Sequence, residues 1–275
     1  MSLGIYRTLL SQISYLCDEM SGYIGNIYKR LSEDRAHGQK RFAVLIDPDK
    51  LRMSNLDRVL KASVDAGVDY FFIGGSLIVS DVLDQLLMSI RQATSIPTVL
   101  FPGNSYQLSY KADGILFLSL ISGRNPELLI GNHVLAAPYL KFSPLEILPT
   151  GYILIDGGVN TTVSYISNTR PIPANKPDIA SCTAMAGEML GLRLIFMDAG
   201  SGALNPVPAE MISAVNNVIS SPLIVGGGIR TPEAAREAAR AGADLIVVGN
   251  AIEKDPGLIE DIASAIHTSR TISSL

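Results

Sequence analysis

Short apolar segments alternate with amphipathic segments along most of the chain, and the clearest example lies in residues 222–252. Leu223–Val225 and Leu245–Val248 are rich in β-branched residues, and each segment runs into a glycine. The stretch between them is helical in pattern, because Thr231 suits the amino-terminal cap and Pro232 suits the first helical position. This order predicts a strand, a helix and a second strand, joined by the right-handed crossover that parallel strands adopt.

Six further apolar segments repeat this rhythm and bring the number of predicted strands to eight. They are Phe42–Ile46, Tyr70–Ile73, Thr98–Phe101, Gly114–Leu118, Tyr152–Ile155 and Leu194–Met197. Because these segments are apolar on both faces, they favour a parallel sheet that is covered by helices. Their even spacing predicts a (β/α)8 TIM barrel of the α/β class, with an open doubly wound sheet as the alternative.

The connections carry three further expectations. Leu135–Tyr139 has strand-like character, and Asp178–Leu190 is predicted to be a helix that ends at the following glycine. Asn168–Asp178 contains three prolines and is predicted to be an ordered, irregular loop. Since this loop carries Arg170 and Lys176, we expect it to close over a bound diphosphate and to exclude water from the site.

The region before the first strand has a different pattern. Apolar residues from Ile5 to Leu31 recur at roughly helical spacing, which predicts one or two helices packed against an end of the barrel. The chain has 275 residues, 47% of them hydrophobic, which suits one barrel of about 250 residues. We therefore expect a single domain, with an N-terminal helical segment over residues 1–40 and the barrel over residues 41–275.

Composition excludes several classes of protein. The net charge is −4 and no basic stripe with interleaved aromatic residues is present, so nucleic acid is not expected as a partner. Cys17 and Cys182 lie far apart without metal-ligand spacing, which argues against a disulfide framework or a zinc site and fits a reducing cytoplasm. No apolar run reaches the roughly 20 residues that span a bilayer. A soluble, cytoplasmic protein without a transmembrane segment is expected, and transient contact with a membrane surface stays open.

Glycines gather after the last two predicted strands. Gly226, Gly227 and Gly228 follow the seventh strand, and Gly249 and Asn250 follow the eighth. Bare backbone amides of this kind bind phosphate, and the loops after strands seven and eight form the usual phosphate site of a TIM barrel. The alternative is structural, because tight turns also need glycine.

Asp47 is a candidate metal ligand because it directly follows the first predicted strand. Mg²⁺ is usually bound by one or two protein carboxylates together with phosphate and water, and Asp49 and Ser76 could assist. The alternative is that Asp47 and Asp49 only cap the following helix.

Asp198 is the second candidate for chemistry, since it follows the sixth strand and precedes Ala199–Gly202. Its carboxylate could bind the hydroxyl groups of a ligand whose phosphate lies against Ser201 and the glycine loops. A phosphorylated polyol would satisfy both features. The alternative is that Ser201 and its neighbours only form a turn.

The remaining candidates are less specific. Asp156 begins an Asp-Gly-Gly turn after the fifth strand and suits either an acid or a turn residue. No catalytic triad is visible, since no nucleophile context surrounds the histidines, which are expected on the surface or in loops: His37, His133 and His267.

Taken together, the strand-end motifs resemble the geranylgeranylglyceryl phosphate synthase family, which includes the bacterial PcrB-type prenylglyceryl phosphate synthases. The most specific motifs are LIDPDK (45–50), RPIPANK (170–176) and AGSGA (199–203), and GGGI (226–229) and GN (249–250) are shared with many phosphate-binding barrels. The resemblance covers almost the whole chain after residue 40 and is strongest to the group with Bacteroidetes and some archaeal members.

The resemblance implies Mg²⁺-dependent transfer of a prenyl group, geranylgeranyl or similar, from an allylic diphosphate to the C3 hydroxyl of sn-glycerol 1-phosphate. The product would be an ether lipid precursor. Asp47 and Ser76 match Mg²⁺ ligands, Asp47 and Asp198 match catalytic positions, and the family's habit implies a homo-oligomer, either a dimer or a hexamer. Glycerol phosphate would be bound by residues at three strand ends: Phe196, Asp198, Ala199, Gly200, Ser201, Gly227, Gly228, Gly249 and Asn250.

Two of these positions depart from the family's pattern. Phe196 stands where the family has tyrosine and so lacks a hydroxyl, and Asp198 stands where it has glutamate and so sets the carboxylate back by one methylene. A prenyl tail also needs an apolar groove. Residues near the strand ends that could line it are Leu77, Ile78, Leu118, Leu120, Ile121 and Tyr139.

Two other functions compete with prenyl transfer. A sugar-phosphate isomerase would use Asp47 and Asp156 as acid and base and would need neither a metal nor an apolar groove. The other alternative is a barrel that binds a phosphorylated metabolite without turnover. The departures from the family's pattern at Phe196 and Asp198 are compatible with it.

Overall fold

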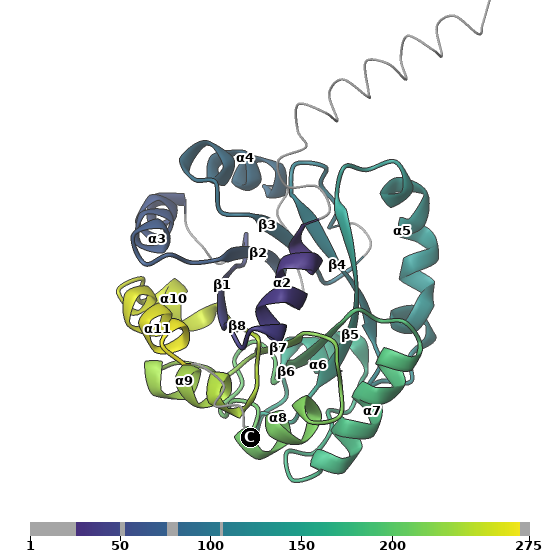
Figure 1. Cartoon of the computed structure of the whole chain (residues 1–275). Coiled ribbons are helices and arrows are strands. Elements are labelled where there is room, and N and C mark those ends of the chain that lie inside the picture. Colours follow the sequence, from purple (N-terminus) through teal and green to yellow (C-terminus); the bar gives the residue numbers. More distant parts are fainter. Residues whose placement is uncertain (1–25, 50–52, 76–81, 105–106, 270–275) are drawn as a thin grey trace, which may run out of the picture.

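Eight parallel strands close into a barrel in the computed structural model, which describes residues 26–49, 53–75, 82–104 and 107–269 (Figure 1). Each strand pairs with the next one along the chain, and β8 pairs with β1. The strands are β1 (Arg41–Ile46), β2 (Tyr70–Gly75), β3 (Thr98–Pro102), β4 (Gly114–Leu120), β5 (Glu146–Leu154), β6 (Leu194–Asp198), β7 (Leu223–Gly226) and β8 (Leu245–Val248). The predicted TIM barrel is therefore confirmed.

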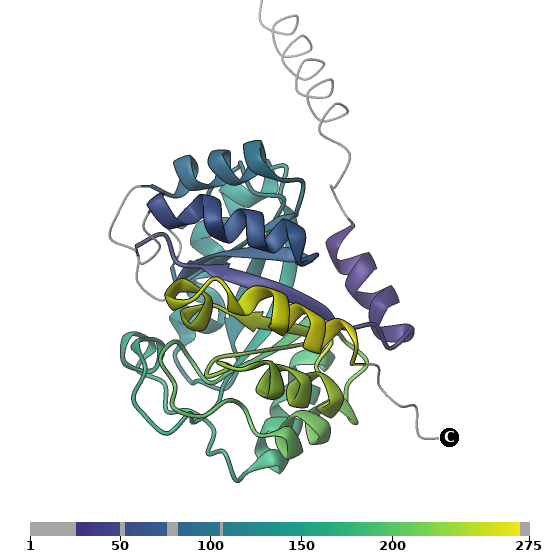
Figure 2. The same ribbon diagram turned by 90° about the vertical axis from the view of Figure 1, so that its left-hand side faces the viewer.

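Helices surround the barrel and connect most of the successive strands (Figures 1 and 2). They are α3 (Met53–Asp65), α4 (Leu83–Ala93), α5 (Asn132–Lys141) after a π-helical turn η1 (Glu127–Gly131), α6 (Thr162–Ser167), α7 (Pro177–Met189), α8 (Ala209–Asn216), α9 (Pro232–Ala241), α10 (Asn250–Lys254) and α11 (Leu258–His267). The amino end of α9 is capped as predicted, because the Thr231 hydroxyl oxygen accepts a hydrogen bond from the Ala234 amide at 3.2 Å and Pro232 is the first helical residue.

Successive strand residues point alternately into the barrel and toward the helices, as the geometry of a strand requires. In β6, Phe196 belongs to the cluster that fills the barrel, whereas Ile195 and Met197 pack in the layer below the helices. The next inward position is Asp198, at the carboxyl end of the strand. The apolar interior thus ends in a layer of polar side chains at this face of the barrel.

The opposite end of the barrel is closed by α2 (Ile27–Ala36), which lies across the ring of strands in Figure 1 and beside one end of the barrel in Figure 2. Ile27 and Leu31 are buried in the same cluster as the inward residues of the strands. The amides of Ile27 and Tyr28 donate hydrogen bonds of 2.7 and 3.0 Å to the carboxylate of Glu146, at the start of β5. The helix therefore plugs the amino-terminal end of the barrel.

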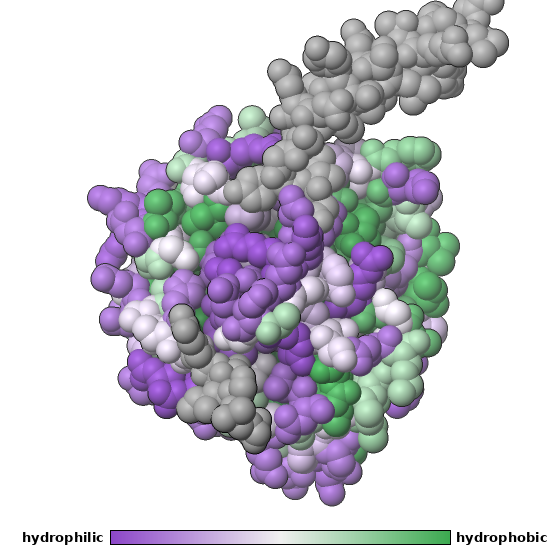
Figure 3. Space-filling view, in the orientation of Figure 1, coloured by the Kyte–Doolittle hydropathy of each residue, from purple (hydrophilic) through white to green (hydrophobic). Residues whose placement is uncertain are grey.

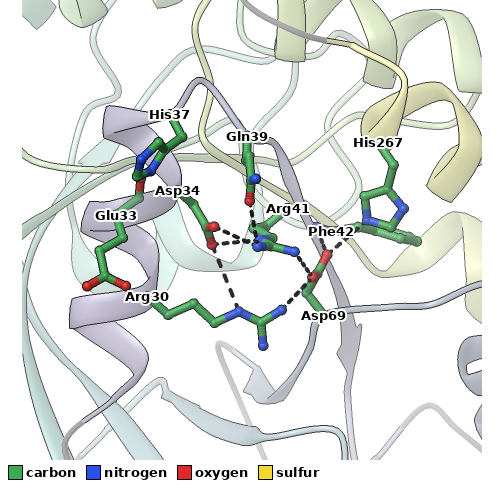
Figure 4. Close-up of polar contacts among 9 residues, drawn as sticks. All are labelled: Arg30, Glu33, Asp34, His37, Gln39, Arg41, Phe42, Asp69 and His267. Carbon is green, nitrogen blue, oxygen red and sulfur yellow. Dashed lines mark hydrogen bonds and ion pairs between the residues drawn. The ribbon is translucent and has the colours of Figure 1, made fainter.

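Charged side chains fasten this plug to β1 and β2 (Figure 4). Arg41 donates two hydrogen bonds of 2.6 Å to the carboxylate of Asp34 in α2 and one of 2.8 Å to Asp69. Asp69 also accepts from Arg30 at 3.2 Å and contacts the imidazole Nε2 of His267 at 2.9 Å. Burial opposes ionisation of Asp69, but hydrogen bonds and the nearby cations outweigh it and lower the pKa of its carboxyl.

Several expectations need correction or completion. Leu135–Tyr139 is not strand-like but lies in α5, where His133, Ala136 and Leu140 are buried at helical spacing. β5 begins at Glu146, six residues before the predicted start of the strand at Tyr152. Most of the helical segment predicted from Ile5 lies outside the described residues.

The other predicted connections agree with the structure. α7 matches the helix expected over residues 178–190 within one residue at each end. The loop before α7 is irregular but anchored, because Ile172 donates to the Leu154 carbonyl and accepts from the Asp156 amide, each at 2.9 Å. None of the described helices is both long and apolar enough to cross a bilayer.

The surface is uneven in character. Polar residues cover the outer side of α2, whereas apolar residues gather along the side of the molecule that carries α5 (Figure 3). The exposed apolar residues of this helix and of its ends are Ile130, Val134, Leu135, Tyr139 and Phe142.

We predict that Asp69→Ala lowers the free energy of unfolding by about 3 kcal/mol, because Arg41 and Arg30 lose a buried counter-charge. The measurement is urea unfolding at neutral pH, with Asp65→Ala, an exposed aspartate of α3, as the matched control. Since Asp69 has a lowered pKa in the folded protein, the difference should persist above about pH 4 and vanish as the pH falls through that lowered value. Equal stability of the two variants at neutral pH would contradict this role.

Candidate active site

A polar pocket opens at the carboxyl ends of the strands, where active sites of TIM barrels lie. Asp47 after β1, Asp198 at the end of β6 and the glycine loops after β7 and β8 line it together. Of the residues predicted to bind glycerol phosphate, all but Ala199 line this pocket. Ala199 is buried, and its amide instead donates to the Gly226 carbonyl at 3.1 Å.

The loop after β7 approaches the loop after β6 so closely that only glycine fits. Gly227 and Gly228 have positive φ angles of 78° and 71°. A Cβ at 227 would lie 2.4 Å from Oδ1 of Asp198 and 2.6 Å from the amide of Gly200, and a Cβ at 228 would lie 2.5 Å from the Asn205 carbonyl oxygen. These glycines therefore bring backbone to the wall of the pocket, which is the arrangement that binds anions.

Side chains join the loops around this backbone. The hydroxyl of Ser201, after β6, donates a hydrogen bond of 3.2 Å to Oδ1 of Asn250, at the start of α10. Arg230 follows the β7 loop, lines the pocket and donates to the carbonyl oxygens of Ala203 and Leu204. This guanidinium gives the pocket a positive charge that the sequence analysis missed, although its place two residues after the glycines was a signal for it.

Asp198 is buried and held at both of its carboxylate oxygens. Oδ1 accepts a hydrogen bond of 2.8 Å from the Gly200 amide, and Oδ2 accepts one of 2.5 Å from the phenol of Tyr152 in β5. Burial raises the pKa of Asp198, and these two hydrogen bonds to its ionised form work against that rise. Burial and the carboxylate raise the pKa of Tyr152 well above its usual value, so this phenol stays protonated and can donate.

Asp47 lies at another part of the same pocket and is also buried. Its Oδ1 accepts a hydrogen bond of 3.1 Å from the Asp49 amide. Its Oδ2 would lie 2.9 Å from a Cβ at position 75, so glycine at that position leaves the carboxylate its place. Ser76, the other predicted metal ligand, lies outside the described residues.

An apolar cavity adjoins the polar pocket. Gly75, Phe101 and Tyr152 line both spaces. Apolar residues from β4, α5 and their neighbours form most of the remaining wall: Leu108, Ile115, Leu116, Leu118, Leu120, Leu128, Ala136, Leu140 and Val163. The two spaces therefore meet at one common wall.

The residues predicted to line the apolar groove lie in different places. Leu118 and Leu120 line the apolar cavity, whereas Ile121 packs against the core between the strands and the helices and Tyr139 is exposed on α5. Leu77 and Ile78 lie outside the described residues. His133 corrects the expectation of a surface or loop histidine, because it is buried in α5 and lines this cavity.

The remaining predicted site residues lie apart from the pocket. Arg170 and Lys176 are exposed and line neither cavity in the described structure, so their contact with a diphosphate stays a prediction. Asp156 is exposed, and its Oδ1 accepts a hydrogen bond of 2.9 Å from the Gly158 amide within its own turn.

Comparison with known proteins agrees with this architecture. The model of the PcrB family matches residues 35–269. The chain belongs to the PcrB family. It is 55% identical to geranylgeranylglyceryl phosphate synthase of Chitinophaga pinensis over 246 residues, which are 90% of this chain and 98% of the relative. The corresponding protein of Spirosoma linguale is 53% identical over 237 residues, which cover 86% and 95% of the two chains.

A solved structure supports the same membership of the PcrB family. The crystal structure of (S)-3-O-geranylgeranylglyceryl phosphate synthase from Thermoplasma acidophilum, in complex with sn-glycerol-1-phosphate, superposes with a TM-score of 0.83 at 32% identity and covers 88% of this chain and 98% of that one. The predictions of the family and of an enzyme of the prenyltransferase class are therefore confirmed.

We predict that Gly227→Ala weakens binding of inorganic phosphate by about tenfold or more, because the new Cβ meets the Asp198 carboxylate and displaces the loop. Gly202→Ala is the matched control, since Gly202 lines the same pocket at a φ of 87° but has open space where its Cβ would stand. Calorimetric titration of both variants separates the close approach from backbone strain. Equal losses in the two variants would mean that strain alone accounts for the effect.

Proposed function

We propose that the protein transfers a prenyl group from an allylic diphosphate, such as geranylgeranyl diphosphate, to the C3 hydroxyl of sn-glycerol 1-phosphate, with Mg²⁺ as cofactor. The observation that carries this proposal is the meeting of a polar, glycine-walled pocket with an apolar cavity at Gly75, Phe101 and Tyr152. The reaction needs both kinds of space, because a charged acceptor must meet a hydrocarbon donor at one bond. The names of the relatives point to the same chemistry.

The polar pocket supplies the acceptor end. The phosphate of glycerol phosphate would lie against the backbone of Gly227, Gly228 and Gly249, with Ser201 and Asn250 beside it. The glycerol hydroxyls would then reach toward Asp198. A carboxylate that already accepts two hydrogen bonds from the protein has lone pairs left for a third, since each oxygen can accept more than one.

The apolar cavity supplies the donor end. Burying the hydrocarbon chain there stabilises the complex by about 0.8 kcal/mol for each CH₂ group removed from water. The diphosphate would lie at the common wall of the two spaces, near Asp47. Arg170 and Lys176 would then reach it only if their loop moves toward the mouth of the barrel.

Asp47 fits the cation that this reaction requires. Among the described residues, no group of three or more acidic, histidine or cysteine side chains could hold a metal ion, so a cation beside Asp47 and the predicted ligand Ser76 would take its other ligands from phosphate oxygens and water. Mg²⁺ is usually bound in this way. When bound, it would offset the charge that develops on the leaving diphosphate.

The proposed reaction breaks one bond, forms one bond and moves one proton. The bond between the allylic carbon and the diphosphate oxygen breaks, the acceptor oxygen bonds to that carbon, and the acceptor hydroxyl loses its proton. Asp198 orients the hydroxyl and takes the proton at a carboxylate oxygen. Because burial raises the pKa of Asp198, its carboxylate is a stronger base than that of an exposed aspartate.

The competing isomerase is less well supported. Its acid–base pair would be Asp47 and Asp156, but Asp156 is exposed in its own turn and does not line the pocket. A barrel that only binds a phosphorylated metabolite leaves the adjoining apolar cavity without a role.

We predict that Asp47→Asn keeps the fold but loses Mg²⁺-dependent turnover by about a hundredfold or more, because the cation loses its charged protein ligand. The assay incubates protein with sn-glycerol 1-phosphate and geranylgeranyl diphosphate, with and without Mg²⁺, and quantifies the extracted ether lipid. Asp156→Asn is the matched control and should keep its activity. Near-normal activity in Asp47→Asn would overturn the metal assignment.

We predict that Leu118→Phe shifts donor preference toward shorter allylic diphosphates by about tenfold in kcat/KM, since the larger ring shortens the apolar cavity. Comparison of geranyl and geranylgeranyl diphosphate at saturating glycerol 1-phosphate measures the shift. Tyr139→Ala, on the exposed face of α5, serves as the control and should leave the ratio unchanged. An unchanged ratio in Leu118→Phe would place the prenyl chain elsewhere.

A further inference from the structure

Tyr152 lies where the polar pocket and the apolar cavity meet. It is inward-facing on β5 and lies in register with Phe196 of β6. Its ring lines both the polar pocket and the apolar cavity, and its hydroxyl donates to Oδ2 of Asp198 at 2.5 Å. The phenol thus ends at the carboxylate, while the ring forms part of the wall between the two spaces.

The surroundings of Tyr152 fix the direction of this hydroxyl. Its ring packs perpendicular to that of Phe196, with centroids 5.4 Å apart, and edge-on to that of Phe101 at 5.9 Å. Such aromatic contacts restrict the ring to one orientation. Because a tyrosine hydroxyl lies in the ring plane, fixing the ring fixes where the phenol can donate.

We propose that Tyr152 is a positioning residue for the acceptor, which holds the Asp198 carboxylate at the junction of the two cavities in the orientation that receives the acceptor hydroxyl. The amide of Gly200 holds Oδ1, so the phenol is the second fixed point that stops the carboxylate from rotating. Phe196 brings no hydroxyl to this place, and the hydroxyl comes instead from the neighbouring strand. This role of Tyr152 rests on the proposed function in one respect, since the group that Asp198 receives is the acceptor hydroxyl of that reaction.

The hydrogen bond also bears on the charge of Asp198. Among the described residues, the titratable and charged groups that line this pocket with it are Asp47 after β1, Tyr152 in β5, Arg230 after β7 and Glu253 in α10. Of these, Tyr152 donates directly to the carboxylate. Without that bond, burial would favour the protonated carboxyl more strongly.

Tyr152→Phe tests this role, because it removes the hydroxyl and keeps the aromatic ring. In Tyr152→Phe, we expect the midpoint of the Asp198 carboxyl titration to rise by about one pH unit. The titration is followed by carbon-13 NMR of aspartate-labelled protein, and the Asp198 signal is assigned with Asp198→Asn. The KM for glycerol 1-phosphate should rise by about tenfold, whereas the KM for the prenyl diphosphate should stay the same because the ring still lines the apolar cavity. Tyr70→Phe is the matched control: Tyr70 is equally buried, and its hydroxyl makes no hydrogen bond within the described part of the chain.

The two readouts separate this inference from the proposed function. An unchanged titration midpoint in Tyr152→Phe would overturn the positioning role, and so would an equal rise of both KM values. A wild-type protein without turnover would overturn the proposed function, while the titration would still decide whether Tyr152 controls Asp198. Tyr70→Phe should match the wild type in the titration and in both KM values.

Discussion

Closure of the barrel between β1 and β8 is the constraint on which the site depends. Asp47 follows β1 and Asn250 follows β8, so they come from opposite ends of the barrel sequence and meet only because these strands pair. Parallel strands all end at one face, which gathers the polar residues after β1, β6, β7 and β8 there. The apolar interior beneath them contributes about 1.5–3 kcal/mol for each fully buried large side chain, which offsets the cost of burying Asp198.

The sequence predicted the parts of the molecule in which one local signal decides the structure. Apolar segments ending in glycine or aspartate gave the strands and their carboxyl ends, and the glycines at 226–228 and 249 marked loops that line one pocket. Leu135–Tyr139 was interpreted wrongly because a short apolar segment suits either a strand or one side of a helix. Its helical character is set by the burial of His133, Ala136 and Leu140 against the barrel.

Residues defined by pairing between strands could not be predicted in the same way. Tyr152 stands inside an apolar strand, and nothing local indicates that register places it beside Phe196 and within reach of Asp198. No local pattern in the sequence marks Arg41 and Asp69 either, although together with Asp34 and Arg30 they hold α2 across the barrel. Such contacts join residues that are distant in the chain, so they follow from the fold and not from composition or spacing.

The plug formed by α2 separates the roles of the two ends of the barrel. Ile27 and Leu31 fill the amino-terminal end, and the polar pocket lies at the carboxyl ends of the strands. The interior between them is a packed core and not a pore. None of the charged residues that hold α2 in place, Arg30, Asp34, Arg41 and Asp69, lines the pocket. Substitutions at the plug can therefore change the stability of the fold while the lining of the pocket stays the same, so the two ends of one barrel are free to vary independently.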